Sequence, residues 1–144
     1  MITALSVQQQ IAAAFAAACP ELATAGVAIL CEDALDIAAA AANALAKVGC
    51  VGIVATPQFT PAGQGNPAAV AMDAEAALEF YETAANRQRQ DAVTALSCAL
   101  YAAQNCPANY GLTNVSQDSL GEGVLRARVA IAVTLNLTPE TTEE

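Results

Sequence analysis

The clearest pattern in the chain is an alternation of apolar and other side chains over residues 125–137. Every odd position there is apolar, whereas Arg126 and Arg128 occupy even positions. A period of two predicts a β-strand with one face on a core and the other facing water or a partner. Strands usually have about 5 or 6 residues, so this longer one predicts a hairpin or sheet edge that reaches beyond its own core. Such a shape favours an assembly component over an enzyme.

Two segments in the first third of the chain repeat apolar residues at the spacing of an α-helix. The first has an apolar stripe from Val7 to Leu22, with Ser6 as its N-cap and Pro20 marking its end or a loosened last turn. The second begins with acidic residues and a cap within 32–36, and its apolar face comprises Ile37, Ala41, Leu45 and Val48. Gly49 follows it, where a left-handed cap belongs.

A third helix is predicted from about Asp91 to just before Cys106, because the proline that follows disfavours helical backbone in the residue before it. The polar run 86–91 separates this helix from the preceding segment. Its predicted apolar face comprises Val93, Leu96, Leu100 and Ala103.

Short apolar runs predict strands at 26–31, 50–56 and 112–115. The segment 70–85 fits either a helix or a strand, because it is rich in alanine but alternates in part. We favour a strand over 74–82.

The segment 57–67 is rich in proline and glycine and is predicted to be a loop. Together these elements predict an α+β fold, with a mixed, largely antiparallel sheet and about three helices packed on it. We expect a single domain over residues 1–138, followed by an acidic C-terminal tail at 139–144.

The charge of the chain argues against binding to nucleic acid. Its 144 residues include 14 acidic and 5 basic ones, which gives a net charge of −9. This charge repels phosphate groups and removes the counterion release that drives nucleic-acid binding. Sequence-specific binding of DNA or RNA is therefore not expected, although an acidic wall would let DNA pass without sticking.

The sequence lacks the residue types that most catalytic and metal sites need. It has no histidine, so neither a Ser-His-Asp nor a Cys-His arrangement can form, and its one lysine, Lys47, lies at a predicted helix end. The five cysteines show no Cys-x-x-Cys spacing, which favours free, buried thiols over a disulfide framework or a zinc site. We expect no catalytic residue, cofactor or metal.

Three carboxylates before the second helix, Glu32, Asp33 and Asp36, are candidates for binding a hard cation. Acidic residues at a helix start are also the ordinary complement of the helix dipole, and we favour that interpretation.

The apolar N-terminal stretch has no basic residue before Lys47, so it does not fit the pattern of a secretory signal. We expect it to remain in the protein as an amphipathic helix. Asp36, Asn43 and Lys47 interrupt the longest apolar run, so no membrane span is predicted.

The four arginines fall into two pairs, one before the third predicted helix and one on the terminal strand. Arginine forms bidentate pairs with carboxylates and is enriched at interfaces. We therefore consider contacts between these pairs and carboxylates of another copy, including those of the tail at 140–144. Pairing within the chain, or plain solvation, is the alternative. The candidate interface residues are Arg87, Arg89, Arg126, Arg128, Glu32 and Asp33.

The order of these elements resembles the tail-terminator, or tail-completion, proteins of tailed bacteriophages and related prophages. The closest local matches are the Thr-Pro-Gln-Phe segment at 56–59 and Glu82 followed by Asn86 and Arg87. Relatives often have proline after that glutamate and asparagine, and Thr83 departs from this pattern. The likeness covers nearly the whole chain apart from its acidic tail.

The resemblance implies an α+β domain that assembles into a six-membered ring. Such a ring caps the head-proximal end of the tail tube, stops polymerisation of the tube protein and joins the tail to the head-completion protein of the neck. The implied partners are further copies of the chain, the tube protein and the head-completion protein, with DNA passing through the lumen. The implied location is the virion tail, after assembly in the host cytoplasm, and no catalytic residue is implied.

Two other functions remain open. One is a different neck or head–tail connector component. The other is a small cytosolic ligand-binding α+β domain, in which residues 63–66 would form a lid.

Overall fold

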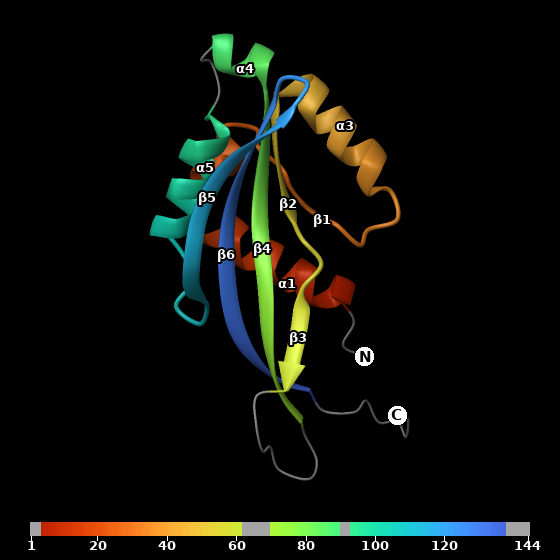
Figure 1. Ribbon diagram of the computed structural model, residues 1–144, viewed down its shortest axis with the longest axis vertical. Helices are drawn as coiled ribbons and strands as arrows, with labels where there is room; N and C mark the ends of the chain where they lie inside the picture. Colours follow the sequence, from red (N-terminus) through yellow and green to blue (C-terminus); the bar gives the residue numbers. More distant parts are fainter. Residues whose placement is uncertain (1–3, 62–69, 90–92, 138–144) are drawn as a thin grey trace.

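A computed structural model describes residues 4–61, 70–89 and 93–137 (Figure 1). These residues form five helices and one six-stranded, mostly antiparallel sheet, which confirms the predicted α+β fold. The helices are α1 (Ala4–Ala18), α2 (Pro20–Thr24), α3 (Ile37–Lys47), α4 (Ala84–Arg89) and α5 (Ala95–Gln104). The strands are β1 (Ile29–Cys31), β2 (Cys50–Val54), β3 (Gln58–Pro61), β4 (Val70–Thr83), β5 (Gly111–Gly121) and β6 (Val124–Leu137).

The sheet has the order β1-β2-β4-β6-β5, and β3 pairs with β4. β1 and β2 are parallel and are connected through α3, whereas the other neighbouring strands are antiparallel. β4 pairs with β6 along all of its 14 residues. The sheet therefore has a long central ribbon, with β1 at one edge and β5 at the other.

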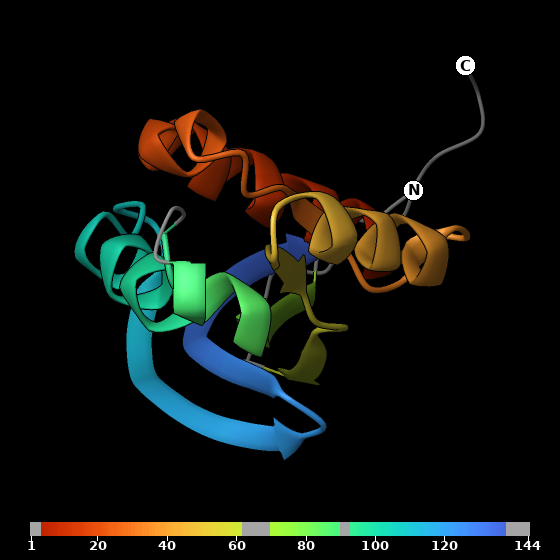
Figure 2. The same ribbon diagram turned by 90° about the horizontal axis from the view of Figure 1, so that it is seen from above.

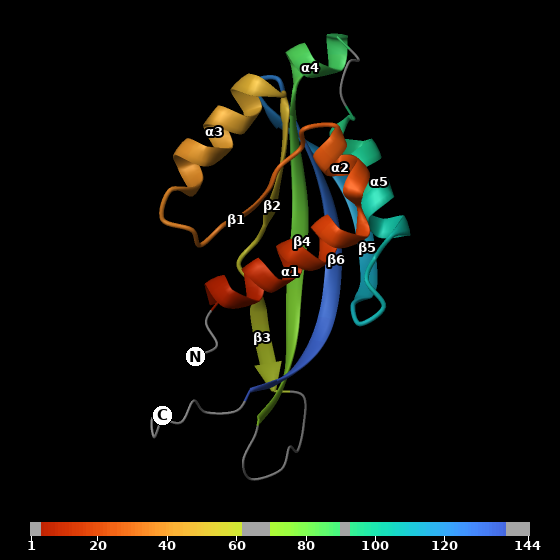
Figure 3. The same ribbon diagram turned by 180° about the vertical axis from the view of Figure 1, so that it is seen from behind.

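Helices α1, α2 and α5 lie on one side of the curved sheet (Figures 2 and 3). The core lies between them and the sheet, where Ile11 and Phe15 of α1 are buried together with Leu78 and Phe80 of β4. Val129 and its odd-numbered neighbours on β6 are also buried, which confirms the alternation read from the sequence. Among the described residues, no helix has the length and apolar character needed to cross a membrane.

Two strands extend further than the sequence predicted, whereas β1 and β2 are shorter than the predicted 26–31 and 50–56. The structure resolves the ambiguity at 70–85 in favour of a strand as far as Thr83, after which α4 begins. β4 is longer than the predicted 74–82, and β5 is longer than 112–115. The prediction of a loop over 57–67 was wrong for β3, which pairs with Met72–Glu75 of β4. Pairing with a neighbouring backbone stabilises these segments, and side-chain alternation does not record that pairing.

The helix ends also differ from the prediction. Ser6 lies inside α1 and is not its N-cap, and the chain forms a second short helix after Ala18 with Pro20 in its first turn, where the missing N–H is no loss. The polar run at 86–91 was predicted to separate two elements without being helical itself. Its residues 86–89 are instead part of α4, which occupies 84–89. Thr94 caps α5 by accepting a hydrogen bond from the Ser97 amide, so α5 begins later than Asp91.

The predicted apolar face of the third helix was wrong for Leu96 and Leu100, whereas Val93 and Ala103 pack against the core. The buried residues of α5 are Ala95, Cys98, Ala99 and Ala102, whereas Leu96 and Leu100 are exposed. A helix that packs on a sheet through alanines approaches the strands closely, so the small residues turn inward and the leucines remain outside.

All five cysteines are free, and Cys19, Cys50 and Cys98 are buried in the core. The sulfur atoms of Cys50 and Cys98 lie 4.0 Å apart. The contact with Cys50 and burial raise the pKa of the Cys98 thiol. The predicted lid at 63–66 and the acidic tail at 139–144 lie outside the described residues, as does Asp91 itself.

Candidate interface site

The side of the sheet turned away from α1 and α2 carries a group of polar side chains, and Figure 1 looks onto this side. The register places Glu79 of β4 opposite Arg128 of β6, and Tyr81 of β4 opposite Arg126. Asp118 of β5 lies on the other side of Arg126. We call these five residues the charged cluster.

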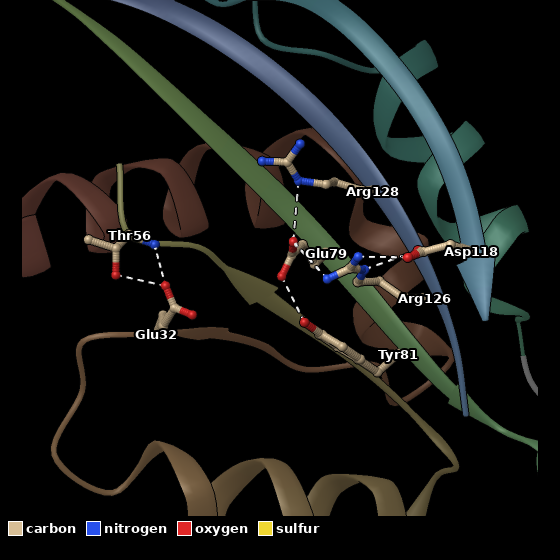
Figure 4. A network of polar contacts seen from close by, with 7 residues as sticks. All are labelled: Glu32, Thr56, Glu79, Tyr81, Asp118, Arg126 and Arg128. Atoms are coloured by element: carbon tan, nitrogen blue, oxygen red, sulfur yellow. Dashed lines mark hydrogen bonds and ion pairs between the residues drawn. The ribbon is translucent and has the colours of Figure 1, made fainter. Parts of the chain in front are cut away.

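Glu79 is the centre of the charged cluster (Figure 4). Its carboxylate accepts a hydrogen bond of 2.7 Å from the Tyr81 hydroxyl. It also forms ion pairs with Nε of Arg128 at 3.2 Å and Nη1 of Arg126 at 3.8 Å. The Glu79 side chain is only 11% exposed. Two guanidinium groups and one hydroxyl thus offset the cost of taking this carboxylate out of water.

Arg126 also forms a bidentate pair with Asp118. Its Nε lies 3.0 Å from Oδ1 and its Nη2 lies 2.7 Å from Oδ2. The hydrogen bonds from Arg126 lower the pKa of Asp118, and the same bonds raise the pKa of Arg126. Both groups therefore stay charged at neutral pH, and the pair fixes the Arg126 side chain across β5 and β6.

Tyr81 is held in its neutral form. Burial, and next the hydrogen bond to Glu79, raise the pKa of Tyr81 to about 12. At neutral pH the phenol is a hydrogen-bond donor to Glu79 and does not act as a base.

A second polar network joins the start of the β1–α3 connection to the end of β2. Oε1 of Glu32 accepts hydrogen bonds from the amide of Thr56 at 2.6 Å and from its hydroxyl at 2.7 Å (Figure 4). Oδ1 of Asp33 lies at 2.7 Å from the same hydroxyl. The Asp33 amide donates to Oε1 of the buried Gln8 on α1 at 2.9 Å. These contacts hold the connection against both the sheet and the first helix.

The expectation that acidic residues begin and cap α3 was wrong in its detail. Asp36 stands at the N-cap position but makes no side-chain capping hydrogen bond, and the first turn contains no acidic residue. Glu32 and Asp33 lie before the helix and bond to Thr56 instead. Within the described part of the chain, no group of three or more potential metal ligands gathers here or elsewhere.

The structure thus places the candidate interface residues in separate positions. Arg126 and Arg128 are brought together and pair within the chain, while Glu32 and Asp33 belong to the other network. The terminal nitrogens of Arg128 point away from Glu79, and the side chain is 46% exposed (Figure 4). Arg128 can therefore take a further partner without losing its first one.

Arg87 and Arg89 lie on α4, and their side chains are outside the described part of the structure.

The sequence reasoning missed Glu79, Tyr81 and Asp118. The alternation in β4 carried a signal for the first two, because residues 79 and 81 share a face opposite the buried Leu78 and Phe80. Asp118 gave no such signal, since it lies in the part of β5 that the sequence did not predict as strand.

The Glu82 and Asn86 motif forms a buried hydrogen bond at the junction between β4 and α4. Nδ2 of Asn86 donates to Oε2 of Glu82 at 2.7 Å, and both residues are fully buried. The Asn86 amide donates to the Thr83 hydroxyl at 3.3 Å, and the Thr83 amide donates to the Gly49 carbonyl at 3.0 Å. The motif therefore links the β4–α4 junction to the turn between α3 and β2.

A polar hollow of about 260 Å³ lies beside Arg128. Its lining includes Thr56, Gln58, Glu75 and Thr113. The hollow and the charged cluster together make a polar surface that is suited to hydrogen bonds and ion pairs with a partner.

Comparison with known proteins yields no matching protein-family model and no significant match among curated proteins.

Proposed function

We propose that the chain is a structural protein of the phage tail, which forms a ring, with six copies the expected number, at the head-proximal end of the tail tube. The observation that carries this proposal is the long, exposed edge strand β5. Among the strands that the structure describes, β5 pairs with β6 alone, and every residue of β5 except Val115 is exposed. Long exposed edge strands are a hazard for monomeric proteins, which usually shorten, charge or cover them. An edge of this kind fits a protein that works by contact with other chains.

The distribution of charge supports the same function. The charged cluster combines two arginines with two carboxylates, so its positive and negative charges cancel. The chain as a whole carries a net charge of −9. A balanced surface allows two acidic copies to approach each other. The remaining acidic surface suits a lumen along which DNA slides, because like charges prevent sticking.

In this role the chain has no catalytic step, and its partners are further copies of itself, the tail tube protein and a head-completion protein of the neck. It would assemble in the host cytoplasm and remain in the virion.

The test is to inactivate the gene in the phage or prophage that carries it and to examine the particles by electron microscopy. We expect heads without attached tails, together with tubes of irregular length, because nothing stops polymerisation of the tube protein. Tubes of normal length that fail to join heads would support another neck component instead. Normal, infectious particles would overturn both.

A further inference from the structure

An apolar groove lies between the first two helices and the β1 edge of the sheet. It encloses about 330 Å³, and we call it the alanine groove. Its walls come from α1, α2 and the segment that leads into β1. They include Ala13, Ala16, Ala23, Ala28 and Ile29. The four alanines are exposed, so an approaching side chain can reach them.

Exposed leucines lie on α5, the helix that neighbours α2. Leu96 and Leu100 lie one turn apart on α5 and are 36% and 53% exposed. Tyr101 of α5 donates a hydrogen bond to Glu21 of α2. Since each helical residue turns by about 100°, the two leucines point away from α2.

A third exposed leucine lies near the start of β5. Leu112 lies opposite the buried Ile131 in the register, so it shares the helix-bearing side of the sheet, and it is 46% exposed. We call Leu96, Leu100 and Leu112 the leucine edge.

The side chains that line both surfaces are uncharged in an otherwise strongly acidic chain. Residues 1–20, 22–31 and 92–117 contain no Asp, Glu, Lys or Arg, and these segments supply the groove lining, α5 and the first half of β5. Glu21 of α2 bonds to Tyr101 of α5 and is not among the residues that line the groove. Two copies that carry −9 each repel one another, and this repulsion is weakest where neutral surfaces meet. The neutral apolar groove and the neutral leucine edge therefore match in charge as well as in polarity.

We propose that the leucine edge of one copy docks into the alanine groove of the next copy. The two surfaces differ from each other and come from different elements, so the contact is head-to-tail, and repeated contacts of this kind close into a ring when the rotation allows. This inference rests on the proposed ring and identifies the surfaces that would build it. It differs from the arginine contacts considered from the sequence, because the docking is apolar and leaves the charged cluster intact.

Two variants separate the halves of the contact. The first is the leucine-edge variant, Leu96→Glu with Leu100→Glu, which keeps an intact groove. The second is the groove variant, Ala16→Glu, which keeps an intact leucine edge. The matched controls are Leu35→Glu and Ala39→Glu, since Leu35 is 106% exposed before α3 and Ala39 is exposed on α3. Circular dichroism verifies that each variant folds.

Light scattering after size exclusion measures the assembly. We expect rings from the wild type and both controls, and monomers from each interface variant alone. Mixed in equal amounts, the two interface variants should form a dimer and nothing larger, because the mixture can make one intact contact and no second. Sedimentation velocity at high concentration detects this dimer.

Rings formed by either interface variant, or a mixture that stays monomeric, would overturn the contact and leave the proposed function standing. A wild type that stays monomeric would also overturn the contact. The proposed function fails separately, through normal particles after inactivation of the gene.

Discussion

Glu79 is the residue on which the charged cluster depends. Replacing it by alanine leaves Arg126 and Arg128 without their shared anion and the Tyr81 hydroxyl without its acceptor. Hydrogen bonds to charged groups contribute about 1.5–3 kcal/mol each, and exposure of the arginines reduces this value here. We expect Glu79→Ala to lower the free energy of unfolding by about 1–3 kcal/mol, measured by urea denaturation.

The matched control for this change is Asp118→Ala. It removes the bidentate partner of Arg126 but acts on a carboxylate whose side chain is 49% exposed, so water replaces the lost bonds and the loss should be smaller. A Glu79→Ala variant as stable as the wild type would contradict a central role for this carboxylate.

Tyr81 should make stability depend on pH in the alkaline range. Its pKa is raised from the ordinary 10.0 to about 12 in the folded protein. As pH rises between these values, the unfolded chain loses the phenol proton while the folded protein keeps it, so the free energy of unfolding falls. Below pH 10.0 both states keep the proton, and this contribution to the pH dependence disappears.

Urea denaturation of the wild type and Tyr81→Phe across this pH range measures the effect. The variant should show the shallower decline, because it has no phenol to titrate. Equal slopes would mean that Tyr81 titrates at its ordinary pKa in the folded protein.

At the scale of elements, the β5–β6 hairpin depends on its two-residue turn. Glu122 and Gly123 have φ values of 54° and 76°, and positive values at both positions are those of a type I′ turn. Left-handed backbone costs a residue with a Cβ about 1–2 kcal/mol, and a Cβ at Gly123 would also lie 3.4 Å from that of Ala84. We expect Gly123→Ala to lower the free energy of unfolding by about 1–2 kcal/mol, measured by denaturation.

The chain offers a matched control at the other end of β5. Gly111 lacks a positive φ, and its added Cβ would meet only the Ala132 carbonyl at 3.7 Å. Gly111→Ala should therefore change the free energy of unfolding by less than about 0.5 kcal/mol. Equal losses from both substitutions would show that the turn geometry is not the cause.

At the scale of the whole molecule, the effect of ionic strength distinguishes apolar docking between copies from arginine–carboxylate pairing between copies. Added salt screens repulsion between acidic chains and leaves apolar docking intact, so rings built through the leucine edge should become more stable. Rings held by arginine–carboxylate pairs should instead weaken, since salt screens that attraction. We expect the assembled fraction, measured by light scattering, to rise between about 0.1 M and about 1 M salt.

The amino-acid sequence determined the features that depend on local patterns. Alternation fixed which residues of β6 are buried, since a strand turns successive side chains to opposite faces. Gly49 has a φ of 87°, as predicted for a residue after a helix end, because glycine adopts that backbone without strain.

Only the tertiary structure decided the features that depend on distant segments. β3 and the second half of β5 are strands because β4 and β6 lie beside them, and no local pattern contains that information. Leu96 and Leu100 of α5 lie outside because the helix approaches the sheet through alanines, contrary to the positions predicted from hydrophobicity. Arg126 and Arg128 lie beside Glu79 and Asp118 because of the register between β4, β6 and β5. This register is a property of the assembled sheet.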